Sequence, residues 1–342
     1  MNKKSPANGH ESFLKSGHAT KVNTAPVLLL VFNRPDLTAR VFGAIRKAKP
    51  ARLFVAADGP RHGREEEVGV CEETRRITEH VDWKCEVARL YRKENMGCKL
   101  AVSGAISWFF ENVEQGIILE DDCLPVHDFF LYTSELLERY SSLEDIGTIT
   151  GFNPHPDRSE YHTSYHFSQH PMIWGWATWR RVWQQYDVSI SSWDGEADDL
   201  GNVVANRYLR AYLAQAFNQV SSGALDTWDF QLVYLCVRKR LLTAVPVVNL
   251  VENIGFDERA THTRNYCGRI SFPDVSSLTF PLCHPDNFAV DREFDHKLEK
   301  LTWKVPDNLY EAVTSRIIAP VRVWGGKVLR ALGLKRPRNS GV

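Results

Sequence analysis

The sequence predicts an α/β fold with a doubly wound, mostly parallel sheet, and three observations support this. Short segments rich in leucine and β-branched residues recur through the N-terminal part of the chain, as expected of strands buried on both faces. Segments with helical spacing of apolar residues lie between them. Polar residues directly follow several of the apolar segments, which is where open parallel sheets bind ligands.

The strand and helix patterns alternate as in βαβ units. The predicted strands cover residues 26–32, 52–57, 85–91, 116–119 and 147–150. The predicted helices between them cover residues 37–48, 64–80, 98–112 and 128–140. From about residue 151 the alternation ends, and we expect a polar loop (152–170), a tryptophan-rich segment (171–186), helices (200–221 and 229–240) and a strand-like segment (241–250).

Composition narrows the class of protein. With 342 residues, 43% hydrophobic and 25% charged, the chain has the balance of a globular protein with a substantial core. Its seven cysteines form no CxxC pair, which favours reduced thiols in the cytoplasm over a zinc module. We find no apolar run of membrane-spanning length, and residues 1–24 are predicted to be a disordered arm, not a signal peptide.

The charge is unevenly distributed. The formal net charge is zero, but residues 316–342 contain seven basic and no acidic residues, which leaves 35 basic and 42 acidic residues, or −7, in the rest. An acidic body argues against nucleic-acid binding. Apolar residues at helical spacing within 316–338 predict a basic amphipathic helix, which would either lie on the inner face of a membrane or dock on protein. Both readings stay open.

Three predicted strands end in polar residues that a parallel sheet would bring to one edge. The first strand is followed by Asn33 and Arg34, and the second by Asp58. The fourth leads into an acidic triplet, 120–122. Each feature has a purely structural alternative, as a helix start or a turn. Their convergence on one edge predicts a ligand site.

The acidic triplet consists of Glu120, Asp121 and Asp122. Three adjacent carboxylates repel one another, so we expect a positive charge opposite them. Mg²⁺ or Mn²⁺ fits best, because these ions bind carboxylate oxygens and complete their coordination with phosphate oxygens. The alternative is that Asp121 or Asp122 caps the following helix.

Two later segments contain further candidates. Asp226 and Asp229 flank Trp228, and a carboxylate partly desolvated by aromatic neighbours suits a general base; the alternative is that Asp226 caps a helix whose first turn holds Asp229. His262 is a candidate metal ligand or a solvated loop histidine.

The tryptophan-rich segment includes Trp174, Gly175 and Trp176. Aromatic rings stack on the C–H faces of sugars, but they also dominate protein cores. We expect a mixture, with some rings buried and one or two lining a sugar pocket.

In order along the chain, these motifs resemble the GT-A-fold glycosyltransferases, in particular N-acetylglucosaminyltransferase I and bacterial family-2-like relatives. The resemblance runs through PVLLLVFNRP, FVAADG, YRKENMGCKLAVSGA, IILEDDCLPVHDFF, PMIWGWATW, TWDFQ and NIGFDERATHT and spans about residues 26–263. The sequence has EDD where D-x-D is commoner in these enzymes, so the choice of metal-binding acid stays open.

The resemblance implies a role for each of these residues. Asn33 and Arg34 would meet the nucleotide or its diphosphate, Asp58 the uracil, and Glu120 and Asp121 the ribose or donor sugar. Asp122 would be the main protein ligand of Mn²⁺ or Mg²⁺. Asp229, or alternatively Asp226, would be the base that deprotonates the acceptor hydroxyl. Thr261 and His262 would lie in a loop that closes over the diphosphate, with His262 in reach of the metal.

The resemblance also implies an organisation and an activity. Residues 25–265 would form the catalytic domain, with a nucleotide-binding half (25–150), an acceptor half (151–265) and a C-terminal extension (266–342). The expected activity is an inverting, metal-dependent transfer of a hexosyl or N-acetylhexosaminyl group from a nucleotide-sugar, favouring UDP, to a glycan or lipid-linked acceptor. The alternatives are a nucleotidyltransferase and an inactive nucleotide- or carbohydrate-binding module.

Overall fold

The computed structural model describes residues 23–157, 159, 161–195, 200–201, 203–256 and 273–306. The predicted N-terminal arm up to residue 22 and the basic segment 316–338 lie outside the described residues, as do Thr261 and His262.

The core is one eight-stranded sheet in the order β3-β2-β1-β4-β8-β6-β9-β7. The strands are β1 (Val27–Val31), β2 (Arg52–Ala57), β3 (Glu86–Tyr91), β4 (Gln115–Glu120), β6 (Ile146–Thr150), β7 (Tyr165–Ser168), β8 (Trp176–Trp179) and β9 (Leu242–Pro246). β7 and β8 run opposite to the other six, so the sheet is mostly parallel. The predicted fold class is confirmed.

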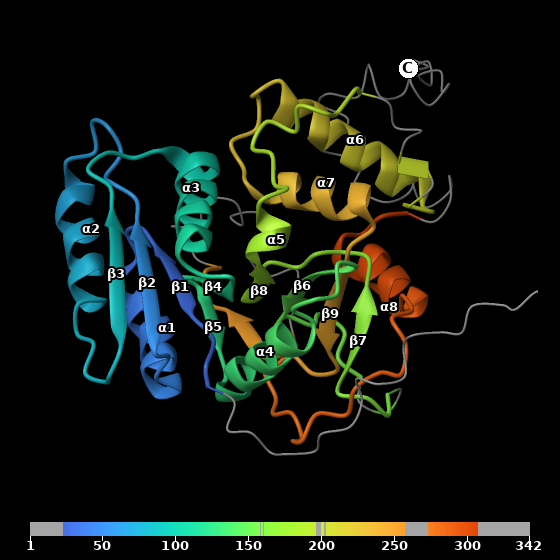
Figure 1. Ribbon diagram of the computed structural model, residues 1–342. Coiled ribbons are helices and arrows are strands. Elements are labelled where there is room, and N and C mark those ends of the chain that lie inside the picture. Colours follow the sequence, from blue (N-terminus) through green and yellow to red (C-terminus); the bar gives the residue numbers. More distant parts are fainter. Residues whose placement is uncertain are drawn as a thin grey trace, which may run out of the picture.

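Helices cover both faces of this sheet (Figure 1). They are α1 (Pro35–Ala48), α2 (Glu66–Ile77), α3 (Gly97–Asn112), α4 (His127–Arg139), α5 (Arg180–Trp183), α6 (Arg207–Ser221), α7 (Asp229–Lys239) and α8 (Arg292–Lys297), which continues as a π-helical turn, Leu298–Thr302. α1 packs against α2 and α4 on one face, and α3 packs against α5 on the other. This is the doubly wound arrangement that the alternating pattern predicts.

The strands form where the sequence supplies unbroken apolar runs. All five residues of β1 are buried, and β1 pairs in parallel with β2 on one side and β4 on the other. α1 follows with Pro35 in its first turn, where the missing N–H has no partner to lose. It ends at Lys49 in the left-handed conformation, just before Pro50.

The tryptophan-rich segment contributes a central strand that the sequence analysis did not predict. β8 lies between β4 and β6, antiparallel to both, and all four of its residues are buried. β7 and β9 extend the same sheet, so strands from both predicted halves of the catalytic domain form one layer.

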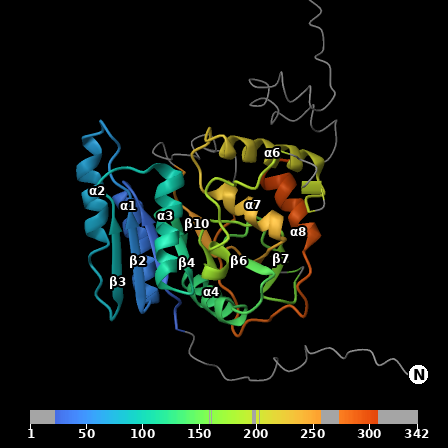
Figure 2. The same ribbon diagram turned by 45° about the horizontal axis from the view of Figure 1, so that its top comes forward.

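A second apolar cluster forms beside the sheet. α6 and α7 pack together around Leu213, Phe217 and Val237, and Asn206 caps α6 by accepting the N–H groups of Tyr208 and Leu209 at 2.9 and 3.4 Å. We call α6, α7 and the loop 222–228 between them the helical lobe; Figures 1 and 2 show it beside α3.

Two smaller features complete the fold. β5 (Cys123–Pro125) pairs with β10 (Val251–Asn253) in an antiparallel ribbon that directly follows the acidic triplet. In the described part of the chain, every helix is too short or too polar to cross a lipid bilayer.

Candidate functional site

The sheet order places the predicted polar residues side by side. β1 lies between β2 and β4, and the three strands are parallel. Arg34 and Asp58, which follow β1 and β2, and Glu120, the last residue of β4, therefore lie at one edge of the sheet. Asn33, which is partly buried, lies at the same edge.

Arg34 supplies a positive charge to the acidic triplet. Its guanidinium donates a hydrogen bond to Asp121 Oδ1 and pairs with Asp122 Oδ2 at 3.0 Å. Asp121 is 3% exposed, and its Oδ2 is buried without a hydrogen-bond partner among the described residues. One guanidinium thus faces three carboxylates, which leaves the cluster with excess negative charge.

This excess perturbs the acids. Burial, followed by the charges of Asp122 and Asp121, raises the pKa of Glu120 to about 8. Burial also raises the pKa of Asp121 to about 6, because desolvation outweighs the opposing effect of Arg34. Burial of Arg34 disfavours its charge, yet the two aspartates outweigh this and raise its pKa. The triplet is therefore an electrostatically unfavourable cluster that a further cation would relieve.

The raised pKa of Glu120 predicts a pH-dependent stability. A carboxyl group with a higher pKa in the folded than in the unfolded protein stabilises the fold when protonated, and this stabilisation is lost as pH rises from its ordinary 4.5 to about 8. Glu120→Gln cannot lose this stabilisation, because the amide stays neutral at every pH. We therefore expect the melting temperature of Glu120→Gln to exceed that of the wild type by about 2–4 °C at pH 8 and to match it near pH 5.

Thermal melts in EDTA between pH 5 and 8 measure this difference. The control is Glu72→Gln, which changes an exposed residue on α2. Parallel pH profiles for Glu120→Gln and the wild type would contradict it.

Asp58 joins the end of β2 to the start of α3. Its carboxylate accepts the N–H of Gly59 at 3.0 Å and that of Met96 at 3.1 Å to either oxygen. Burial raises the pKa of Asp58, opposed by these hydrogen bonds and by Arg92 and Arg75. Asp58 is thus a turn residue, as the structural alternative expected; the contact with uracil implied by the resemblance stays a prediction.

Cys98, at the start of α3, is influenced by acidic residues from three segments of the chain. Burial, followed by the charges of Glu120, Asp229, Asp226 and Asp58, raises the pKa of its thiol to about 12. A charge affects a thiol in this way only at short range. The end of β2, the end of β4 and the helical lobe therefore all lie near the N-terminus of α3. Sequence analysis did not single out Cys98.

The two candidate bases are held differently. Asp226 Oδ1 accepts the N–H of Lys99 at 3.0 Å, and its Oδ2 accepts that of Cys98 at 3.2 Å. Asp226 therefore caps α3, not the following helix α7 as the structural alternative expected. Asp229 begins α7, and its Oδ1 accepts hydrogen bonds from Thr227 Oγ1 and, at 2.8 Å, from the N–H of Phe230. No described residue donates to Asp229 Oδ2, so this oxygen is available to a substrate.

Of the two tryptophans predicted to line a sugar pocket, Trp176 is in the core. Trp176 is 1% exposed and stacks on Trp228, with centroids 5.8 Å apart at 18°. Its predicted place in a sugar pocket is wrong, because β8 sits in the middle of the sheet. Trp174 is only partly buried and packs its ring on Phe152 at 4.5 Å and on Phe256 at 5.7 Å.

Gly175 lies at a point of close backbone approach, with φ +63°. A Cβ there would lie 2.7 Å from Val251 Cγ2. Gly175→Ala is expected to lower the free energy of unfolding by about 3 kcal/mol, from left-handed strain and overpacking. Urea denaturation measures this, and Gly43→Ala on α1, where a Cβ meets no atom within 4 Å, should be neutral or stabilise by up to about 1 kcal/mol. Equal stability of the two variants would contradict the prediction.

The segment after β10 lies against the acidic triplet. Ile254 N–H donates to the Asp122 carbonyl at 2.8 Å, and a Cβ on Gly255 would clash with the Asp122 carboxylate. Gly255 thus allows the chain to pass next to Asp122 just before the predicted closing loop. Thr261 and His262 of that loop lie outside the described residues.

Metal coordination within the described ranges would rest on few protein ligands. These ranges contain no group of three or more His, Cys, Asp or Glu side chains arranged to hold a metal ion. The donors that fit a hard cation are the Asp122 carboxylate and the orphaned Oδ2 of Asp121. This set suits an ion that takes most of its ligands from a bound substrate.

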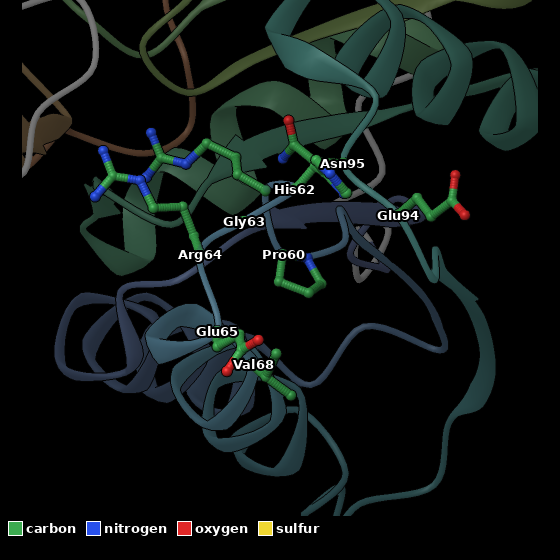
Figure 3. A pocket seen from close by; sticks show the side chains of 9 residues that line it. Pro60, His62, Gly63, Arg64, Glu65, Val68, Glu94 and Asn95 are labelled. Carbon is green, nitrogen blue, oxygen red and sulfur yellow. The ribbon is translucent and has the colours of Figure 1, made fainter.

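A cavity of about 450 Å³ opens beside the end of β2 and was not predicted. Figure 3 shows the turn after Pro60 on one side and Glu94 and Asn95 on the other. The lining residues are Pro60, Arg61, His62, Gly63, Arg64, Glu65, Val68, Glu94 and Asn95. Asn95 Nδ2 donates to the Gly59 carbonyl at 3.0 Å, so the cavity adjoins the Asp58 turn.

Comparison with known proteins adds little. No protein-family model and no curated protein matches the chain. Among solved structures, HddC from Yersinia pseudotuberculosis aligns with a TM-score of 0.28 and 8% identity over 47% of this chain and 80% of its own. The 4-diphosphocytidyl-2C-methyl-D-erythritolsynthase from Anaerococcus prevotii DSM 20548 aligns with a TM-score of 0.28 and 9% identity over 48% and 77%. Similarity this low carries no argument about function.

Proposed function

We propose that the protein is an inverting, divalent-metal-dependent glycosyltransferase that moves a hexosyl or N-acetylhexosaminyl group from a nucleotide-sugar, UDP being favoured, to a glycan or lipid-linked acceptor. One observation carries the proposal: Asp58 and Asp226, which are far apart in sequence, both accept N–H groups at the start of α3, where the charges of Glu120 and Asp229 also raise the pKa of Cys98. The ordered motifs that resemble GT-A enzymes support it.

The donor would bind over the ends of β1, β2 and β4. Arg34 would turn its forked guanidinium toward the diphosphate, assisted by the Asn33 amide. Asp58 would lie nearest the base, and Glu120 and Asp121 nearest the ribose and sugar. The pairing of Arg34 with Asp121 and Asp122 holds its guanidinium at this edge before the donor binds.

Asp122, with His262 as a second candidate, would hold Mn²⁺ or Mg²⁺. A bound cation would stabilise the negative charge that grows on the leaving diphosphate. The excess negative charge of the triplet and the orphaned Asp121 Oδ2 fit such an ion. Thr261 would help the closing loop to exclude water and so limit hydrolysis of the donor.

Asp229 would take the proton of the acceptor hydroxyl on its available Oδ2. A base on the face opposite the leaving group lets the hydroxyl displace the diphosphate directly, which inverts the anomeric carbon. Trp174, partly buried beside Phe256, is the remaining candidate for stacking on a sugar ring.

The second candidate function is a nucleotidyltransferase. Such an enzyme would use the same sheet edge, metal ion and nucleotide, and its released product distinguishes it from a glycosyltransferase.

Incubation with Mn²⁺ and a panel of UDP-, GDP-, dTDP- and CMP-sugars tests the proposal. A glycosyltransferase should slowly release the nucleoside diphosphate, or CMP from a CMP-sugar, even without an acceptor, whereas a nucleotidyltransferase should release pyrophosphate from a nucleoside triphosphate. A binding module would bind nucleotide, seen as a thermal shift, and release neither product. Asp122→Ala should remove the Mn²⁺ dependence of UDP binding and leave the fold intact; unchanged Mn²⁺ dependence would retire the metal assignment.

The proposal also places the enzyme in the cytoplasm, with contact to the inner membrane face through 316–338. Co-sedimentation with anionic vesicles, compared between the full chain and a chain ending at residue 315, tests that contact.

A further inference from the structure

Asp226 links the helical lobe to the nucleotide-binding half of the sheet. It lies in the loop 222–228, yet both of its carboxylate oxygens accept backbone N–H groups from the first turn of α3: Lys99 at 3.0 Å and Cys98 at 3.2 Å. The Asp226 side chain is exposed. Its bonds to Lys99 and Cys98 connect parts of the chain that are 127 and 128 residues apart in sequence. The two charge-assisted hydrogen bonds fix the orientation of the Asp226 carboxylate, and the positive end of the helix dipole attracts its negative charge.

The start of α3 is shaped for this contact. Gly97 has φ +75°, which favours glycine, and a Cβ at this position would lie 2.8 Å from Asp226 Oδ2. The glycine therefore allows the carboxylate to approach the first N–H groups of the helix.

The same turn is anchored to the core at its other end. The Trp228 ring stacks on Trp176, and the Trp228 backbone carbonyl accepts a hydrogen bond from Tyr186 Oη at 2.9 Å. Gln231 Nε2 donates to the Thr227 carbonyl at 2.7 Å, and the Thr227 hydroxyl donates to Asp229. Asp229 therefore lies between two attachments, the buried tryptophan stack and the Asp226 contact with α3.

We propose that Asp226 is a positioning residue: its contact with the N-terminus of α3 holds the 226–229 turn so that Asp229 faces the carboxyl ends of β1, β2 and β4. This rests on the proposed function, in which Asp229 is the base. Asp226 is not itself the base, because both of its oxygens already accept hydrogen bonds from α3, whereas Asp229 Oδ2 accepts none from the described residues.

Kinetics of single variants test the proposal. Asp226→Asn, which keeps the bulk but replaces one acceptor with a donor, should lower kcat about 10-fold, and Asp226→Ala up to about 100-fold, with KM for the donor within about twofold of the wild type. The acidic limb of the kcat–pH profile should keep its midpoint in both. Asp82→Asn, which removes an exposed carboxylate from the loop before β3, controls for loss of surface charge and should change nothing.

Two kinetic outcomes would overturn the proposal. Loss of the acidic limb in Asp226→Asn, with Asp229→Asn retaining it, would make Asp226 the base. An unchanged kcat in Asp226→Ala would show that the contact with α3 does not position Asp229.

A second measurement does not need turnover. Hydrogen–deuterium exchange, measured by mass spectrometry on the peptide that begins α3, reports whether Asp226 protects the Cys98 and Lys99 N–H groups. Asp226→Ala should raise the exchange rate of this peptide about 10-fold over the wild type and over Asp82→Asn, while a peptide from α6 keeps its rate. An unchanged exchange rate at the start of α3 would overturn the link between the lobe and α3. Wild-type protein without sugar transfer would instead overturn the proposed function, and the exchange rates would still decide the link.

Discussion

Replacing Asp229 with asparagine is expected to lower turnover by about 10²–10⁴-fold while leaving the affinity for the donor within about twofold. The amide keeps the size of the carboxylate and can still accept the hydrogen bond from Thr227, so the turn should hold its shape. What is lost is an oxygen that can take a proton from the acceptor. Steady-state rates with donor and acceptor, together with calorimetric binding of UDP, separate the two effects.

The matched control for Asp229 is Asp187, another aspartate that lies close to Tyr186. Among the described residues, the donors to the Asp187 carboxylate are Ser189 and Ser191 of its own turn, so Asp187→Asn should keep turnover within a few fold of the wild type. Full activity in Asp229→Asn would remove Asp229 from the mechanism and with it the direct displacement step.

Replacing Arg34 with methionine is expected to lower the free energy of unfolding by about 3–5 kcal/mol. The fold is destabilised because the Asp121 carboxylate, whose side chain is 4% exposed, would stay charged without a partner, next to Glu120 and Asp122. UDP affinity should also fall, because the guanidinium is the proposed phosphate ligand. Urea denaturation at pH 8 and UDP titration measure the two losses.

Two controls separate the buried charge from the loss of an arginine. Arg46→Met breaks the Arg46–Asp82 pair, whose side chains are 58% and 52% exposed, and should cost no more than about 1 kcal/mol. Adding Asp121→Asn to Arg34→Met should restore most of the lost stability, because the unpaired charge is gone. Equal losses in Arg34→Met and Arg46→Met would show that the triplet does not depend on Arg34.

The first half of the fold could be predicted from local pattern. The expected strands at 52–57 and 147–150 match β2 and β6 to within one residue at each end, and the expected helix 98–112 matches α3. These strands are continuous apolar runs and this helix begins at Gly97, so nearby residues suffice to define them. The helix expected from residue 200 begins only at Arg207, where Asn206 caps it.

The insertion of β8 between β4 and β6 could not be predicted in this way. Its four residues, WATW, read equally well as a buried strand, a core helix segment or a sugar-stacking surface. Only pairing with two strands formed far away in the sequence selects the strand, and that pairing buries Trp176 in the core.

By itself, the sequence determined that this chain forms a mostly parallel sheet and that Arg34, Asp58 and the acidic triplet follow its strands, because hydrophobic runs and the polar residues after them are local properties. Only the tertiary structure decided that Arg34 pairs with Asp121 and Asp122, that Asp226 caps α3, and that Asp229 accepts hydrogen bonds from Thr227 and Phe230 through its Oδ1. Those outcomes depend on which residues, far apart in the sequence, come close in space and compete for each hydrogen bond. The local sequence around each residue does not determine this.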